Sequence, residues 1–312
     1  MKKLNSRGIE MSFTWIFAII VGISVLILAF ILISKIIGIG TMQRDVKVAK
    51  EVGILLNPLE TGFENAKTSS FSIPAESRII NKCYTEGNFG RQVIAISQFG
   101  FGKWSNTDVD VGFLNKYIFS NKTTEGRKFY VFAKPFNFPF KVTDLIYITS
   151  ASDEYCFIGA PENIEDELSN MNQANFFTED CRDNERKIKV CFLGSDCDIV
   201  VRYDEGSGSV LKDGETMYFE NDALMYAAIF SNSAIYECQL KRLMKRLDSL
   251  SQIYMDKIGF SASKGCDSNL NPKLIQLNSY ANSLSSSGNL GQIKTLTEEI
   301  DELNNYAICS LW

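Results

Sequence analysis

Side chains suited to catalysis are scarce in this chain of 312 residues, which contains no histidine. The absence of histidine excludes Ser-His-Asp triads, Cys-His pairs and HExxH zinc sites. Ser261-Ala262-Ser263-Lys264 matches the S-x-x-K string in which a lysine activates a serine nucleophile. No K-T-G string follows it, and the flanking pattern predicts a polar loop between helices. A plain loop is therefore the favoured interpretation.

Acidic residues give no stronger signal for a metal or a hydrolase. Asp108-Val109-Asp110-Val111-Gly112 lacks the third ligand and the terminal glutamate of a calcium-binding loop. Its alternation of acid and valine predicts an exposed edge strand instead. Paired carboxylates for glycoside hydrolysis remain open, because such partners need not be close in sequence. We expect no cofactor and no enzymatic activity, with an anchored cell-envelope enzyme using carboxylates or Ser261 and Lys264 as the alternative.

Cysteine is the most informative reactive residue. An even set of eight in a membrane-anchored domain favours disulfides and an oxidising compartment. Reduced, buried thiols would be the default for a cytosolic domain. Zinc is disfavoured because the chain has neither a CxxC pair nor histidine. The cysteines are Cys83, Cys156, Cys181, Cys191, Cys197, Cys238, Cys266 and Cys309.

One apolar stretch precedes all of these cysteines. Phe13 to Ser34 lies within an uncharged run bounded by Glu10 and Lys35. At about 1.5 Å per residue, a helix of this length crosses roughly 30 Å of hydrocarbon. The stretch predicts a transmembrane helix with the lipid bilayer as its partner. Ala18 and Gly22 form a small-xxx-small face that would allow self-association with a second helix.

Charge and a sequon bear on partners and topology. The net charge of −5 gives no concentrated basic surface, so we expect no nucleic-acid partner. Basic residues flank the apolar stretch on both sides, and their count leaves the orientation open. Asn121-Lys122-Thr123 is a glycosylation sequon in a predicted loop. Together with the cysteines, it favours a single-pass cell-membrane protein whose C-terminal domain is extracytoplasmic.

The N-terminus resembles a processed signal. Arg7-Gly8, directly before the apolar run, resembles the processing site of archaeal type III signal peptides, the prepilin class. The resemblance implies cleavage between Gly8 and Ile9, and an apolar helix that anchors the subunit and packs into a filament core. Prepilins usually carry glutamate at the fifth mature position, which is Phe13 here, and the nearby acid is Glu10. A pilin-like surface subunit is thus one expectation.

Two further strings carry a second resemblance. Gly87-Asn88-Phe89-Gly90-Arg91-Gln92 and Lys241-Arg242-Leu243-Met244-Lys245-Arg246 look similar to an uncharacterised group of archaeal single-pass membrane proteins. That resemblance would extend over most of the chain. It implies no established activity.

Composition along the chain predicts an α+β fold. Short runs rich in β-branched and aromatic residues predict strands over 91–98, 116–120, 127–133, 143–149, 187–193 and 197–203. Asp204 to Gly208 and Lys212 to Gly214 predict hairpin turns. Pro161 opens a helix that places Ile164, Leu168 and Met171 on one face.

These signals divide the chain into an anchor, a linker, a β-rich region and a helical region. We expect a cytoplasmic tip with the anchor over 1–38, a membrane-proximal helix over 39–66, a β-rich ectodomain over 67–220 and a helical region packed on it over 221–312. Phe136, Phe138 and Phe140 either belong to the ectodomain core or form an exposed docking face.

The helical region contains two packing seams and a third helical segment. The apolar residues of each seam recur three and four apart. An antiparallel hairpin would bring Cys238 to Cys309, and we predict this disulfide; fifteen connectivities remain for the other six cysteines. A third segment near Leu274 would complete a small bundle. The seams are Leu240, Leu243, Leu247, Leu250 and Tyr254, and Ile293, Leu296, Ile300, Leu303 and Ala307.

These features favour one functional class over two others. The expected protein is a membrane-anchored, extracytoplasmic structural or partner-binding protein of the cell surface, with a pilin-like subunit as one form of it. The alternatives are the anchored enzyme and an accessory subunit of a membrane complex.

Overall fold

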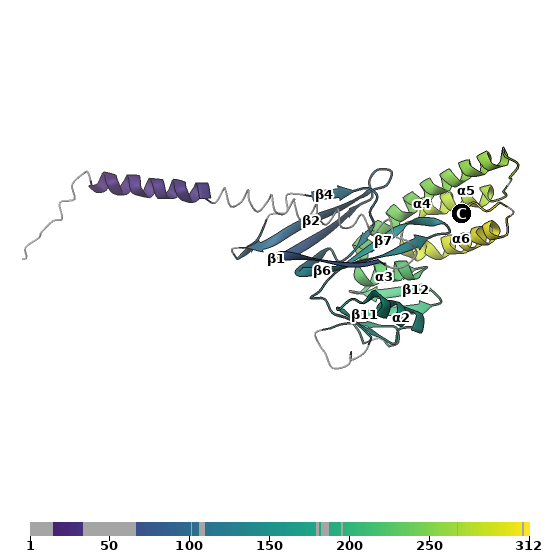
Figure 1. Ribbon diagram of the computed structural model, residues 1–312, viewed down its shortest axis with the longest axis horizontal. Helices are drawn as coiled ribbons and strands as arrows, with labels where there is room; N and C mark the ends of the chain where they lie inside the picture. Colours follow the sequence, from purple (N-terminus) through teal and green to yellow (C-terminus); the bar gives the residue numbers. More distant parts are fainter. Residues whose placement is uncertain are drawn as a thin grey trace, which may run out of the picture. The chain divides into compact units, whose positions relative to one another are not determined.

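The fold is that of a computed structural model, which describes residues 15–33, 67–100, 102–105, 110–178, 181, 187–194, 196–266, 268–307 and 309–312 (Figure 1). The chain divides into two compact units, Met1–Arg44 and Asp45–Trp312. The Gly8–Ile9 processing site and the membrane-proximal helix predicted over 39–66 lie outside the described residues.

The first unit contains an apolar helix over Trp15–Ile33. None of its side chains is buried within the protein. Its 19 residues are long and apolar enough to cross a membrane, and an N-terminal signal sequence meets the same criteria. The predicted apolar helix is therefore confirmed.

The second unit contains two sheets. The first has seven strands in the order β3-β2-β1-β6-β7-β5, with β4 also paired to β2. All neighbours are antiparallel except β5 and β7. Pro74, which has no N–H to donate, lies where the register of β1 and β6 shifts between Ser72 and Ser77. The strands are β1 (Lys67–Tyr84), β2 (Arg91–Gly100), β3 (Lys103–Trp104), β4 (Asp110–Phe113), β5 (Ile118–Phe119), β6 (Thr123–Asn137) and β7 (Lys141–Ser150).

The second sheet has six strands in the order β13-β12-β11-β10-β8-β9. The hairpins β11-β12 and β12-β13 are antiparallel, whereas β8, β9, β10 and β11 pair in parallel. Both predicted hairpin turns are confirmed, with Glu205-Gly206 and Asp213-Gly214 at positive φ. The strands are β8 (Tyr155–Ile158), β9 (Phe176–Phe177), β10 (Ile188–Cys191), β11 (Ile199–Asp204), β12 (Ser207–Lys212) and β13 (Glu215–Phe219).

A short helix, α3 (Asp222–Phe230), is buried between the two sheets (Figure 1). It contacts β5, β6 and β7 of the first sheet and β12 and β13 of the second. Every side chain from Ala223 to Phe230 is buried. Asn221 caps its N-terminus by accepting from the Leu224 N–H at 2.9 Å. A helix apolar all round has no amphipathic periodicity, so the sequence pattern does not predict it.

The core confirms one of the two interpretations of the aromatic run. Phe136, Phe138 and Phe140 are each at most 4% exposed, and they belong to the large core that also contains α3. The predicted helix after Pro161 is also confirmed as α2 (Glu162–Met171), which buries the three apolar side chains of its inner face. The burial of the three phenylalanines therefore excludes them as an exposed docking face.

Three helices complete the fold, α4 (Ser233–Ala262), α5 (Asn271–Ser283) and α6 (Leu290–Asn305). The first three positions of each predicted seam are buried, and the last two are half-buried. The predicted antiparallel pairing of α4 with α6 is wrong. Ser287, just before α6, donates from its N–H to Glu237 near the start of α4 at 2.9 Å, and the segments just beyond the ends of α4 and α6 share a disulfide. Because α5 lies between them in the chain, two reversals bring α6 back to the direction of α4.

All eight cysteines form disulfides. The predicted Cys238–Cys309 bond is wrong, because the parallel course of α4 and α6 places these residues at opposite ends of the helices. Cys238, at the first turns of α4, is bonded to Cys83 of β1, and Cys309 is bonded to Cys266. The remaining pairs are Cys156–Cys181 and Cys191–Cys197.

Candidate functional site

A pocket of about 490 Å³ lies where the β5–β6 connection meets the second sheet. Asn121 contributes from the connection, Lys212 from the end of β12, and Asn232 from the turn between α3 and α4. Tyr155 and Ile199 give the pocket an apolar wall. The pocket thus combines apolar surface with a small set of polar groups, as ligand sites commonly do.

Lys212 is the central group of this pocket. Its Nζ donates to the carbonyl oxygens of Ile229 and Ser231, each at 3.0 Å, and to Asn121 Oδ1, also at 3.0 Å. The two carbonyls belong to the last turn of α3 and the residue after it, where helix carbonyls have no intrahelical donor. Lys212 is the last residue of β12, and the β12–β13 turn that begins at Asp213 fixes the position of its backbone.

Burial changes the acid–base behaviour of this group. The Lys212 side chain is nearly enclosed, and loss of water lowers its pKa to about 8, against the opposing effect of the Asp213 and Asp153 carboxylates. Burial likewise raises the pKa of Asp153, which the Lys212 ammonium lowers in part. The pocket therefore contains an amine that is partly neutral near pH 8.

Asn121, the predicted glycosylation residue, lies between β5 and β6, as expected from the strand pattern. Its side chain is half-buried, and its amide oxygen is bonded to Lys212. The sequon amide is therefore already part of a polar contact within the fold. Glycosylation of Asn121 stays a prediction.

Comparison with family models, with curated proteins and with solved structures found no match. The pilin-like N-terminus and the likeness to archaeal single-pass proteins stay predictions. The two strings that carry the second resemblance nevertheless meet in space: Arg242 Nε donates to the Phe89 carbonyl at 3.1 Å, and Lys245 Nζ donates to the Gly87 carbonyl at 2.8 Å.

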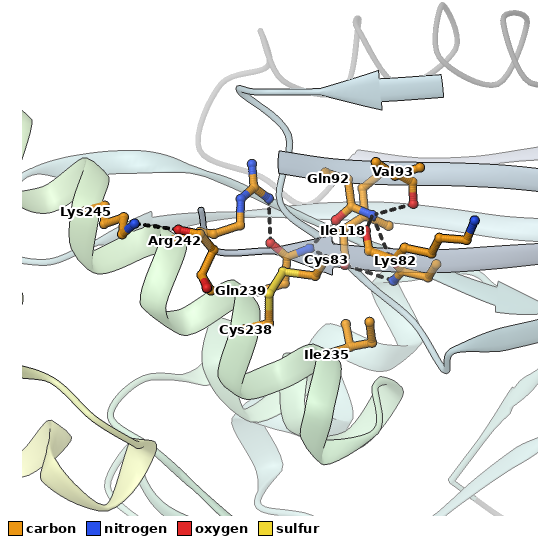
Figure 2. Close-up of a disulfide and its surroundings, with 12 residues drawn as sticks. Lys82, Cys83, Gln92, Val93, Ile118, Ile235, Cys238, Gln239, Arg242 and Lys245 are labelled. Carbon is orange, nitrogen blue, oxygen red and sulfur yellow. Dashed lines mark hydrogen bonds between the residues drawn. A yellow bond between two sulfur atoms is a disulfide. The ribbon is translucent and has the colours of Figure 1, made fainter. Parts of the chain in front are cut away.

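Arg242 is the centre of this second polar cluster, beside the Cys83–Cys238 disulfide (Figure 2). Its side chain is fully buried. Nη1 donates to the Lys116 carbonyl at 2.8 Å and Nη2 to the Leu114 carbonyl at 2.9 Å, while the guanidinium lies over Tyr117, 4.6 Å from the ring centroid. Burial lowers the pKa of Arg242. The guanidinium fork thus fastens α4 to the segment before β5.

A chain of amides continues from Arg242 into the first sheet (Figure 2). Arg242 Nη1 donates to Gln239 Oε1 at 2.7 Å, and Gln239 Nε2 donates to Gln92 Oε1. Gln92 Nε2 in turn donates to Asn81 Oδ1 at 2.6 Å. All of these side chains are buried, so each polar group needs its partner. The cluster joins α4 to β1 and β2.

The S-x-x-K residues lie at the C-terminal end of α4. The Ser261 carbonyl accepts from the Lys264 N–H at 2.9 Å and the Cys266 N–H at 3.0 Å, as in a helix-ending turn. The exposed Lys264 ammonium lies over Phe260, 5.7 Å from the ring centroid. The arrangement matches the favoured interpretation of a turn between helices.

The acidic string is described in part, because Asp108 lies outside the described residues. Asp110 begins β4, which pairs with β2, and its carboxylate accepts from Lys82 Nζ at 2.8 Å. An ion pair on an edge strand agrees with the predicted strand. Among the residues that the structure describes, no group of three or more Cys, Asp or Glu side chains is placed to hold a metal ion.

Sequence reasoning missed Lys212, Asp153 and Arg242. Lys212 occupies an inward position of β12, where alternation of burial places apolar Val210 two residues earlier. That alternation is the signal that could have revealed it. Arg242 occurs in the basic string Lys241 to Arg246, and its burial follows from contacts with a loop more than 100 residues away.

Proposed function

We propose that this chain is a membrane-anchored, extracytoplasmic protein of the cell surface that acts as a structural or partner-binding subunit, with a pilin-like subunit as its specific form. The observation that carries the proposal is the complete pairing of eight cysteines in one domain of a chain that begins with an apolar helix. Disulfides of this number persist in oxidising compartments and are rare in the cytosol.

The distribution of the disulfides supports a domain built for persistence. Cys83–Cys238 joins residues 155 apart and ties the first sheet to α4. Cys266–Cys309 holds the ends of α4 and α6 together, 43 residues apart. Crosslinks over long segments restrict the unfolded chain and so favour the folded domain. A structural subunit exposed outside the cell benefits from this resistance.

The apolar helix supplies the anchor and a surface for self-association. Gly22 has open space where a Cβ would stand, and Ala18 lies one turn before it. Helices with such small residues approach each other closely in a bilayer. In the proposed assembly these faces pair between copies of the chain.

Sidedness is the direct test of this proposal. A membrane-impermeant amine-reactive label applied to intact cells expressing the full chain is expected to modify exposed ectodomain lysines such as Lys103. Labelling that appears only after lysis would overturn the proposed topology. A cytosolic lysine-rich protein in the same cells serves as the control for membrane integrity.

Self-association is tested in the same membranes by chemical crosslinking. The Gly22→Leu variant is expected to lose most of the crosslinked dimer, whereas Val21→Leu, on a neighbouring face, keeps it. Equal crosslinking in both variants would contradict the assembly through the anchor. Retention of a different protein in stoichiometric amount would favour the accessory-subunit alternative.

A further inference from the structure

We propose that Lys212 and Asn121 react to form an intramolecular amide crosslink between the end of β12 and the β5–β6 connection. Lys212 Nζ donates to Asn121 Oδ1 at 3.0 Å, so the carbon that would be attacked, Cγ, is one bond beyond the contacting oxygen. The two residues are 91 apart in sequence, and the fold holds them together. Such positioning replaces an encounter between reactants with an intramolecular step.

The amine is suited to nucleophilic attack. A solvated lysine is almost wholly protonated near neutral pH and has no free electron pair. The Lys212 side chain is only 9% exposed, and burial lowers its pKa to about 8, so a substantial fraction is neutral at mildly basic pH. A desolvated lysine of this kind is a recognised form of activated nucleophile.

Asp153 acts on the Lys212 amine through its charge, from outside the lining of the pocket. Burial raises the pKa of Asp153, and the Lys212 ammonium lowers it in part. Asp153 precedes β8, and its backbone carbonyl accepts from Asn175 Nδ2 at 3.2 Å, which helps to fix the segment. Water is therefore the proton acceptor in the proposed step, and it reaches the pocket past exposed Thr123 and Asp213.

The reaction balances without a co-reactant. The Lys212 ammonium loses a proton to water, and the free electron pair of Nζ attacks Asn121 Cγ. The Cγ–Nδ2 bond then breaks, Nδ2 leaves as ammonia after receiving one proton from water, and the second Nζ proton of the tetrahedral adduct is lost to water. The products are one secondary amide and one molecule of ammonia.

The pocket provides the route for the leaving group. It lies directly beside Asn121 and Lys212, with a volume of about 490 Å³. Thr123 and Asp213 on its rim are exposed, so ammonia formed at Asn121 can reach solvent. Nδ2 is also the atom that a glycan would occupy. The crosslink and glycosylation at Asn121 therefore exclude each other.

A purely structural lysine is the competing explanation. In that case the ammonium serves as a cap for the carbonyls of Ile229 and Ser231, and it stays free. The two explanations predict different masses for the chain. Crosslinking removes one ammonia from the chain, whereas capping leaves the composition unchanged.

The test is mass spectrometry of the full chain purified from membranes, reduced, alkylated and digested. We expect a branched peptide joining the Asn121 and Lys212 segments, lighter than the sum of its parts by one ammonia and stable to reduction. Separate, unmodified Asn121 and Lys212 peptides, or a glycan on Asn121, would overturn the proposal. This outcome leaves the sidedness result unaffected, so the two proposals can fail separately.

Variants identify the reacting groups. Lys212→Arg keeps the positive charge and is expected to abolish the branched peptide. Lys103→Arg, on the exposed strand β3, is the matched control and keeps full yield. Loss of ammonia from the Asn121 peptide that persists in Lys212→Arg would contradict the assignment. Circular dichroism of each variant confirms that the fold is retained.

Discussion

Arg242 Nε in α4 donates to the carbonyl of Phe89 at 3.1 Å, across 153 residues of sequence. The Cys83–Cys238 disulfide lies beside this contact, and the Gln239–Gln92 amide pair continues it into the first sheet. One junction between α4 and the β1–β2 hairpin thus contains a covalent bond, a buried cation and an amide chain. The stability of the ectodomain is expected to depend on it.

The first prediction concerns the Arg242 fork. Arg242→Ala removes the guanidinium donors from the Lys116 and Leu114 carbonyls, and we expect a loss of about 3–5 kcal/mol in the free energy of unfolding. Arg242→Lys keeps the charge but loses the fork, with a loss of about 2 kcal/mol or more. Lys241 is a half-buried neighbour, and Lys241→Ala should change the free energy of unfolding by less than about 0.5 kcal/mol. Chemical denaturation measures all three, and equal stability of the Arg242 and Lys241 variants would exclude the role of the fork.

The second prediction compares two glycines of the same loop. Gly87 and Gly90 both have positive φ, +77° and +61°. A Cβ at Gly90 would lie 2.3 Å from the Tyr84 carbonyl oxygen and 2.8 Å from Arg242 Cγ, whereas at Gly87 it would meet nothing within 4 Å. Gly87→Ala should therefore cost about 1 kcal/mol of backbone strain, and Gly90→Ala about 3 kcal/mol or more. Thermal unfolding of both variants measures this difference in stability. Similar transition temperatures for the two variants would contradict the prediction.

The junction also shows how far sequence reasoning reaches. Strand runs, hairpin turns and α2 follow from local composition, because β-branched alternation and turn residues act over a few positions. The Cys83–Cys238 disulfide does not follow from local composition, because the spacing of apolar residues along a helix is the same for parallel and antiparallel packing. The buried state of Lys212 and Arg242 depends on partners about 90 to 150 residues away. No local pattern contains that information.

The third prediction compares a long and a short disulfide loop. Cys83–Cys238 closes 155 residues and Cys191–Cys197 closes six. On the chain-entropy model, removing the first bond costs about 5 kcal/mol and removing the second about 2 kcal/mol. Double Cys→Ser variants of each pair, compared by denaturant unfolding, test this order. A larger loss from the Cys191–Cys197 pair would contradict it.

The fourth prediction is the pH dependence of crosslink formation. The pKa of Lys212 in the fold is about 8, so below pH 8 the neutral amine falls about tenfold for each pH unit. We expect the rate to rise with pH up to about 8 and then to level off. Burial lowers this pKa, and the carboxylates of Asp213 and Asp153 oppose the shift; charged Lys122 and Asp198 also line the pocket. The branched peptide, quantified over time in chain refolded from an unlinked state, gives the rate; a rate that falls from pH 6 to pH 8 would contradict a neutral-amine mechanism.

The proposed function requires a fully disulfide-bonded ectodomain that stands outside the membrane on an N-terminal apolar anchor. The measurement that bears on it first is the intact mass of the native protein from membranes after thiol alkylation, with and without prior reduction. We expect eight alkyl groups after reduction and none without it, and the prepilin resemblance predicts a chain that begins at Ile9. Alkylation of the cysteines without reduction would contradict the proposed function and place this domain in a reducing compartment.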